Sequence, residues 1–192
     1  MADTSLKEKT VSGVAWAAVD QFSNQFVLFM VSVFIARILS PEDYGVIAIV
    51  MIFVSLSAIL VNSGFGTAVI QRREISPELC SSVFFFNVTV SVLLYIALYL
   101  ASPLIASFFD MPVLASVLPL LGIVIIINAT YLMQVSLLTR ELDFKKQSFV
   151  HLTATLVSGS IGLSMAYAGY GVWSLVAQSL SNSLTTSIAY WI

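Results

Sequence analysis

The sequence predicts an all-α membrane protein, a polytopic bundle of six transmembrane helices. Of its 192 residues, 59% are hydrophobic and only 9% are charged, and the mean hydropathy is +0.99. Soluble domains carry about 25% charged residues, so a water-soluble fold is excluded. A helix needs about 20 apolar residues to cross a bilayer, and each run of the sequence without a charged residue is at least that long. These runs cover residues 46–71, 79–109, 111–139 and 147–192.

Local helix signals divide the first half of the chain. A capping box, Ser5–Glu8, begins the first helix. Ser40–Pro41 and Ser76–Pro77 each end one helix and begin the next. Serine caps a helix, proline fits its first turn, and the acids that follow favour the positive end of the helix dipole. These signals predict helices two and three.

The second half is divided by turn residues. Asp110 and Pro112 mark the start of the fourth helix, and Gly169–Gly171 forms a tight turn before the sixth. The expected spans are residues 11–39, 41–70, 77–100, 112–138, 149–167 and 172–192. We expect residues 1–192 to form a single membrane domain. No basic loop follows the last span, which indicates a chain truncated at its C-terminus.

Basic residues predict the orientation, because lysine and arginine near span ends stay on the cytoplasmic side. Seven of the eight lie on one side, with only Arg37 on the other, so both chain ends are expected in the cytoplasm. The seven are Lys7, Lys9, Arg72, Arg73, Arg140, Lys145 and Lys146. The five in loops are also candidates for binding an anionic head group, although they can serve as topology determinants alone.

Polar side chains inside the spans are the candidates for a substrate pathway. At 100° per residue, the four on the first helix share an arc of about 140°. Such groups in hydrocarbon should face other helices or a wet cavity. The candidates are Asp20, Gln21, Asn24, Gln25, Asn62, Asn128, Gln178 and Asn182. For the second, fourth and sixth helices, interhelical hydrogen bonding at about 0.6 kcal/mol each is the favoured explanation, whereas a cavity-lining role is favoured for the first helix.

The fifth helix has a different pattern. Ala154, Ser158, Gly162 and Ala166 repeat at intervals of four and predict a ridge on which a neighbouring helix packs closely. His151 lies at the cytoplasmic end of this helix, where a structural role is favoured over a proton relay.

Catalytic signatures are missing from the sequence. We find no phosphate-binding glycine loop, no cluster of metal ligands and no nucleophile with a base at a known spacing. Cys80 is the chain's one cysteine, so no disulfide forms within it. We therefore expect no enzyme activity, no cofactor, no metal and no nucleic-acid partner.

Several stretches, in order along the chain, carry a family resemblance. They are Lys9–Thr10 with Gly13 and Trp16, Ala36–Pro41 with Tyr44–Gly45, Gly64–Gly66 with Ala68 and Ile70–Ile75, and Arg140–Lys146. This set resembles the polysaccharide exporters of the Wzx and teichuronic-acid type, within the multidrug/oligosaccharidyl-lipid/polysaccharide flippase superfamily. Members of that superfamily have two similar lobes of helices, and this chain resembles the N-terminal lobe.

The resemblance implies a function in surface polysaccharide synthesis, such as lipopolysaccharide or exopolysaccharide. It implies flipping of an oligosaccharide linked to an undecaprenyl pyrophosphate type of lipid across the bacterial inner membrane, by alternating access. The partner would be a missing C-terminal lobe or a second copy of the chain. Two alternatives stay open: an ion-coupled small-molecule exporter in which Asp20 binds the coupling ion, and a membrane scaffold that transports nothing. A membrane sugar polymerase would need a long outward loop with catalytic groups, which the sequence lacks.

Overall fold

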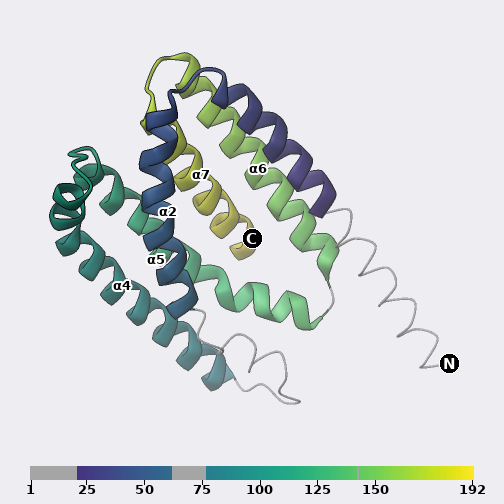
Figure 1. Cartoon of the computed structure of the whole chain (residues 1–192). Helices are drawn as coiled ribbons and strands as arrows, with labels where there is room; N and C mark the ends of the chain where they lie inside the picture. Colours follow the sequence, from purple (N-terminus) through teal and green to yellow (C-terminus); the bar gives the residue numbers. More distant parts are fainter. Residues whose placement is uncertain (1–20, 62–76, 142) are drawn as a thin grey trace.

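The computed structural model describes residues 21–61, 77–141 and 143–192, and all regular structure within these ranges is helical (Figure 1). The helices are Gln21–Ala36, α2 (Pro41–Val61), α4 (Pro77–Phe108), α5 (Leu114–Arg140), α6 (Phe144–Tyr167) and α7 (Val172–Trp191). The all-α class predicted from the sequence is confirmed.

Four of these helices, α2, α4, α5 and α6, are long and apolar enough to cross a membrane. The helix Gln21–Ala36 is apolar but shorter. At 20 residues and without a charge, α7 is long enough, but its serines, threonines and amides interrupt its apolar residues, and it is not among the helices with a stretch apolar enough to cross. It packs mainly on α6 and α5, so much of its polar surface faces protein. The arrangement is that of a multi-pass membrane protein.

The boundary before α2 is held by the predicted serine cap. The Ser40 hydroxyl oxygen accepts a hydrogen bond from the Asp43 backbone N–H at 3.3 Å, and the Asp43 carboxylate accepts one from the Ser40 N–H at 3.0 Å. This reciprocal pairing satisfies two backbone donors that the helix leaves free. Pro41 occupies the first helical position, as predicted. The signals at Ser5–Glu8 and at Ser76 lie outside the described residues.

The helix α4 continues to Phe108, eight residues past the expected span end at Leu100. It does so although Pro103 removes one backbone donor. The carbonyl that loses this donor is that of Tyr99, four residues earlier, and the Ser102 hydroxyl donates to it at 2.8 Å. Because a side chain replaces the missing bond, the helix passes the proline.

The start of α6 also precedes the expected span. This helix begins at Phe144, where the Asp143 side chain accepts a hydrogen bond from the Lys146 N–H at 3.1 Å. The turn between α6 and α7 is as predicted, with positive φ angles of 81° at Gly169 and 54° at Gly171. Glycine suits these positions because it has no Cβ to oppose a positive φ.

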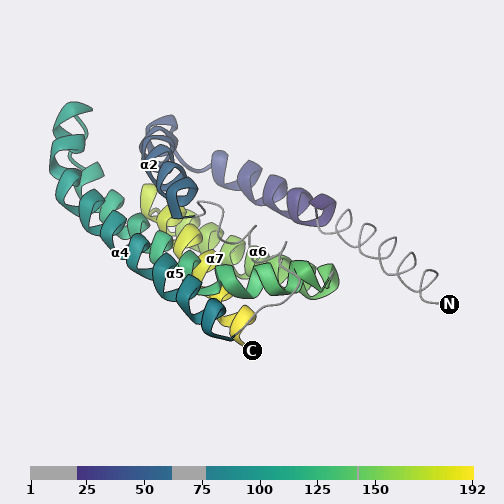
Figure 2. The same cartoon turned by 90° about the horizontal axis from the view of Figure 1, so that it is seen from below.

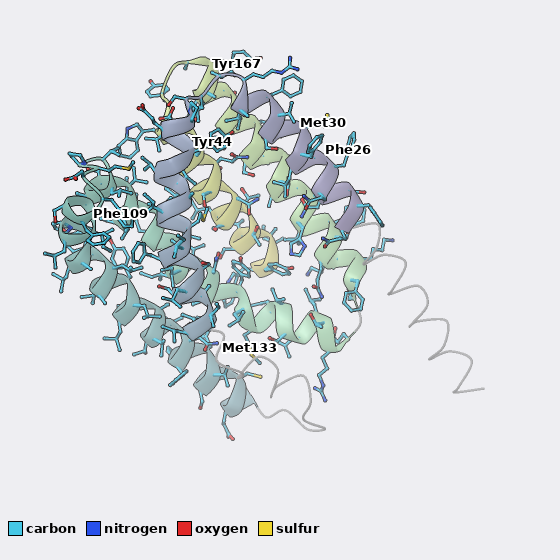
Figure 3. All side chains as sticks on the ribbon, viewed as in Figure 1. Phe26, Met30, Tyr44, Phe109, Met133 and Tyr167 are labelled. Carbon is cyan, nitrogen blue, oxygen red and sulfur yellow. The ribbon has the colours of Figure 1, made fainter. Side chains whose placement is uncertain are left out.

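The helices pack in two pairs, α4 with α5 and α6 with α7, joined through contacts between α5 and α7. Figures 1 and 2 show α4 and the helix Gln21–Ala36 on opposite sides of the bundle, with α7 between them. The largest core cluster joins α5, α2 and α7, with Leu118 and Leu121 of α5 almost fully buried. Large apolar side chains cover the outside, including Phe26, which Figure 3 shows pointing away from the bundle. Such a surface suits lipid.

The predicted small-residue ridge is buried. Ala154, Ser158 and Ala166 are each at most 1% exposed. At Gly162 the contact with α7 is so close that an added Cβ would lie 2.9 Å from the Cβ of Gln178. The ridge therefore lets α7 approach α6 closely, which sets the position of the polar side chains on α7.

Candidate functional site

A cavity of about 520 Å³ lies among five helices: Gln21–Ala36, α2, α5, α6 and α7. Its polar lining consists of Asn24, Asn128, Thr155, Ser158, Gln178, Ser179, Asn182 and Ser183. Its apolar lining consists of Leu28, Ile47, Met51, Val54, Val124 and Leu175. The part of the lining that the structure describes carries no formal charge. Amides and hydroxyls can both donate and accept hydrogen bonds, so this surface suits an uncharged ligand rich in hydroxyl groups.

Four of the predicted pathway residues come together in this cavity. Asn24 comes from the helix Gln21–Ala36, Asn128 from α5, and Gln178 and Asn182 from α7. The polar stripes of three helices therefore share one space, which is the arrangement that the periodicity suggested. Their role in moving a substrate stays a prediction.

The other pathway candidates lie elsewhere. Gln25 lines a neighbouring pocket of about 230 Å³, together with Gln178. Gln21 is exposed and belongs to the lining of neither space. Asp20 and Asn62 lie outside the described residues.

Hydrogen bonds between helices hold the cavity wall in shape. Thr155 of α6 donates to the side-chain oxygen of Asn24, and the Asn182 amide of α7 donates to the Ser158 hydroxyl at 3.2 Å. The sequence offered two explanations for these polar residues, hydrogen bonding between helices and lining of a cavity. Asn24 and Asn182 do both. An asparagine side chain has two donor hydrogens and an oxygen with two lone pairs, and each of these bonds uses only one of them.

The neighbouring pocket contains a buried hydroxyl that lacks a partner. Tyr44 of α2 lines this pocket, and its hydroxyl makes no hydrogen bond within the part of the chain that the structure describes. Buried polar atoms in native proteins are usually paired with protein or water. Gln178 and two leucines, Leu28 and Leu175, line both spaces. The polar surface thus continues from Asn182 to Tyr44.

The basic head-group candidates lie at one end of the bundle. Arg140 ends α5, and Lys145 and Lys146 lie in the first turn of α6, all three exposed. Arg37 lies at the opposite end, because the preceding Ile35 packs on Ala166 near the end of α6. Arg72 and Arg73 lie outside the described residues. The described charges thus keep the asymmetry on which the orientation prediction rests.

Sequence reasoning missed half of the polar lining. Thr155, Ser179 and Ser183 were not proposed, and Ser158 was assigned to packing alone. A usable signal is present on α7, where Ser179 and Ser183 follow Gln178 and Asn182 at the same spacing of four. No comparable signal separates Thr155 from the exposed hydroxyl residues of α6.

Residues 34–192 match a family model described as polysaccharide biosynthesis protein. The chain belongs to this polysaccharide biosynthesis family. The predicted resemblance to polysaccharide exporters is thereby confirmed. No solved structure matches the chain.

Curated relatives of the chain include three bacterial proteins. The chain is 25% identical over 181 residues to the succinoglycan biosynthesis transport protein ExoT of Rhizobium meliloti, covering 94% of this chain and 37% of the relative. It is 25% identical over 183 residues to the lipopolysaccharide biosynthesis protein WzxC of Escherichia coli, covering 95% and 36%. It is 23% identical over 190 residues to the teichuronic acid biosynthesis protein TuaB of Bacillus subtilis, covering 97% and 39%. The chain therefore spans less than two fifths of the length of these relatives.

Proposed function

We propose that this chain forms one lobe of a flippase that exports a lipid-linked oligosaccharide for surface polysaccharide synthesis. The observation that carries the proposal is the cavity of about 520 Å³, lined by eight amide and hydroxyl side chains inside a bundle with an apolar exterior. Support also comes from the relatives, whose names describe succinoglycan transport, lipopolysaccharide synthesis and teichuronic acid synthesis.

The chemistry of the cavity fits a saccharide. Binding pockets for small molecules have volumes of about 300–1,000 Å³, and this one falls within that range. Sugar hydroxyls both donate and accept hydrogen bonds, as the amides of Asn24, Asn128 and Gln178 do. The apolar lining, such as Met51 and Leu175, offers surface for the C–H faces of a sugar ring. The lipid part of the substrate stays in the bilayer, along the apolar exterior.

The pyrophosphate of such a substrate would bind at the basic end of the bundle. Arg140, Lys145 and Lys146 are exposed there, and arginine and lysine both pair strongly with phosphate oxygens. In this proposal that end faces the cytoplasm and the chain lies in the bacterial inner membrane. The basic residues at the entrance would bind the head group first. The uncharged polar side chains of the cavity would then bind the sugars.

Transport in this proposal is by alternating access and involves no covalent chemistry. One lobe presents the cavity, and a second lobe, either the rest of a longer chain or another copy, closes it on alternate sides. The short span relative to the curated relatives is consistent with a lobe that works together with a partner.

The test is complementation with the whole transporter in a strain that lacks its own exporter. Asn182→Leu and Gln178→Leu replace amides of the cavity wall by an apolar side chain of similar size, and surface polysaccharide is expected to be lost. Ser160→Leu is the matched control, because Ser160 is exposed on the outer face of α6, where an apolar residue is tolerated.

Protein levels in the membrane are compared by immunoblot, so that loss of transport is separated from loss of folding. Normal polysaccharide display by both cavity variants would contradict the proposal. Failure of drug efflux with normal polysaccharide display would indicate instead a small-molecule exporter.

A further inference from the structure

The neighbouring pocket of about 230 Å³, which we call the Tyr44 pocket, lies farther from the basic end than the main cavity of about 520 Å³ does. The helices α2 and α7 both begin at the end opposite the basic residues and run toward the basic end (Figure 1). On α2 the Tyr44 pocket is lined by Tyr44, and the lining of the main cavity begins at Ile47. On α7 the lining of the Tyr44 pocket ends at Gln178, and that of the main cavity continues to Ser183. Both helices thus give the same order.

The two spaces share part of their walls and form one elongated lining. Leu28, Leu175 and Gln178 belong to both. Along α2 the joint lining extends from Tyr44 to Val54, which is about 15 Å at the helical rise of about 1.5 Å per residue. That length exceeds a single sugar ring. Ordinary ligand pockets have volumes of about 300–1,000 Å³, so the smaller Tyr44 pocket suits an extension of the main cavity better than a site of its own.

Three polar side chains of the Tyr44 pocket have hydrogen-bonding groups to offer a ligand. The Tyr44 hydroxyl is buried and makes no hydrogen bond within the described chain. No hydrogen bond joins the side-chain amides of Gln25 and Gln178 to a described residue either. A buried hydroxyl costs free energy unless a ligand or water pairs with it, and the two amides can pair with the same ligand. None of the described lining residues is charged, which suits hydroxyl groups better than an ion.

Two of these polar groups are held in place by packing. The Gln178 side chain lies against Gly162 of α6, where an added Cβ would be 3.2 Å from the Gln178 Cδ. Its amide therefore has a defined position at the junction of the two spaces. Tyr44, near the start of α2 in Figure 3, packs on the core cluster of Ile35, Leu39 and Ala166. Groups that are fixed before a ligand arrives lose little entropy on binding it.

We propose that the Tyr44 pocket is a second sugar subsite, in which Tyr44, Gln25 and Gln178 bind a sugar unit farther from the lipid than the unit in the main cavity. The inference rests on the proposed function, since it assumes that the main cavity takes the saccharide of a lipid-linked substrate. With the pyrophosphate at the basic end, the first sugar lies in the main cavity and a later one reaches Tyr44. The lobe should therefore bind a lipid carrying several sugars more tightly than a lipid carrying one.

The experiment measures the protection of cysteines by substrate in the whole transporter, in lipid nanodiscs and with Cys80→Ser as background. Ser179→Cys reports from the main cavity and Ser32→Cys from the Tyr44 pocket. The Ser32 hydroxyl already donates to the Phe29 carbonyl of its own helix at 2.9 Å, so this replacement removes no group assigned to the ligand.

The probes are undecaprenyl pyrophosphate alone, the same lipid with one sugar and the same lipid with the full saccharide. The full form is extracted from the strain that lacks its exporter. The one-sugar form is extracted from that strain when it also lacks the enzyme that adds the second sugar. A water-soluble maleimide labels the cysteines that remain accessible.

The one-sugar form is expected to protect Ser179→Cys alone, and the full form to protect both cysteines. Tyr44→Phe keeps the ring and removes a hydroxyl without a partner in the described chain, so folding should be unaffected. In this variant the concentration of the full form that half-protects Ser179→Cys should rise about fivefold, as for the loss of one ordinary hydrogen bond. The value for the one-sugar form should not change. Tyr170→Phe is the matched control, because this exposed tyrosine lines neither space.

The proposal is overturned if the full form protects Ser179→Cys and leaves Ser32→Cys reactive, because the saccharide then enters the main cavity without reaching Tyr44. It is also overturned if Tyr44→Phe weakens the one-sugar and full forms equally, or weakens neither. If no sugar-bearing form protects Ser179→Cys better than undecaprenyl pyrophosphate alone does, the proposed function fails and the second subsite fails with it. Failure of the subsite alone and failure of the proposed function therefore give different labelling patterns.

Discussion

The close contact between α6 and α7 yields a sharp prediction about two glycines. An alanine Cβ at position 162 would lie 2.9 Å from the Cβ of Gln178 and 3.2 Å from its Cγ and Cδ. Since the Cβ of Gln178 is fixed to the backbone of α7, rotation of the side chain cannot remove the clash, and the helices must separate. At Gly45, in α2, a Cβ would meet no atom within 4 Å.

The magnitude follows from two opposing effects. Replacing glycine by alanine inside a helix stabilises it by about 1 kcal/mol. Forcing an extra methyl group into a packed contact costs about 1–3 kcal/mol. Gly45→Ala should therefore stabilise the protein by about 1 kcal/mol. Gly162→Ala should be destabilising by up to about 2 kcal/mol, because the clash exceeds the gain in helix propensity.

The assay is thermal unfolding of the purified whole protein in detergent, followed by circular dichroism. Gly45→Ala should raise Tm and Gly162→Ala should lower it. The double variant Gly162→Ala with Gln178→Gly removes the Cβ on the opposite helix, and should recover part of the loss despite the second glycine. A Tm that rises as much for Gly162→Ala as for Gly45→Ala would refute the packing argument.

Three further changes test the local chemistry of the helices by the same unfolding measurement. Ser40→Ala removes the cap of α2 and should cost about 1 kcal/mol; an unchanged Tm would mean that the cap is not needed. Ser102→Ala should destabilise by about 1 kcal/mol with Pro103 present and much less beside Pro103→Ala, because the proline creates the need for the hydroxyl; equal effects in both backgrounds would contradict this. Thr155→Val takes away the donor to Asn24 and should cost about 0.6–2 kcal/mol, whereas a neutral effect would show that Asn24 finds another partner.

The helix ends governed by local chemistry were predictable from the sequence. Ser40 with Pro41 gives a cap and a first turn whatever the rest of the fold, and Gly169 and Gly171 supply the positive φ angles that the next turn requires. The small-residue ridge around Gly162 was equally readable, because residues four apart share one face of a helix.

Helix lengths were less predictable, because hydropathy marks the part of a helix that lies in the membrane and not the helix itself. The Asp143 cap starts α6 before Lys145 and Lys146, although both lie outside the expected span. Similarly, the expected span ended at Leu100, and nothing in hydropathy shows that α4 continues past Pro103 because the Ser102 hydroxyl replaces the missing backbone donor.

The candidate site was predictable where side chains are strongly polar. Asn128 and Asn182 stand out because amides in apolar helices need partners. Gln21 shows the limit, since an arc of about 140° is wider than the face that one cavity covers. Serine and threonine did not indicate which face of a helix lines the cavity. Each can donate to a carbonyl of its own helix wherever it points, as Ser160 does to Leu156 at 2.8 Å.

Whether water fills the space between these helices is decided most directly by comparing cysteines at neighbouring positions in the membrane-embedded, active transporter. Thr155→Cys and Ser183→Cys lie on the cavity wall, while Thr153→Cys and Leu184→Cys lie on the outer faces of the same helices. With Cys80→Ser as background, a small charged thiol reagent should modify the first pair and leave the second pair unmodified. If the cavity cysteines are as unreactive as the outer ones, the polar side chains only join helices, and no aqueous pathway for a saccharide passes through this lobe.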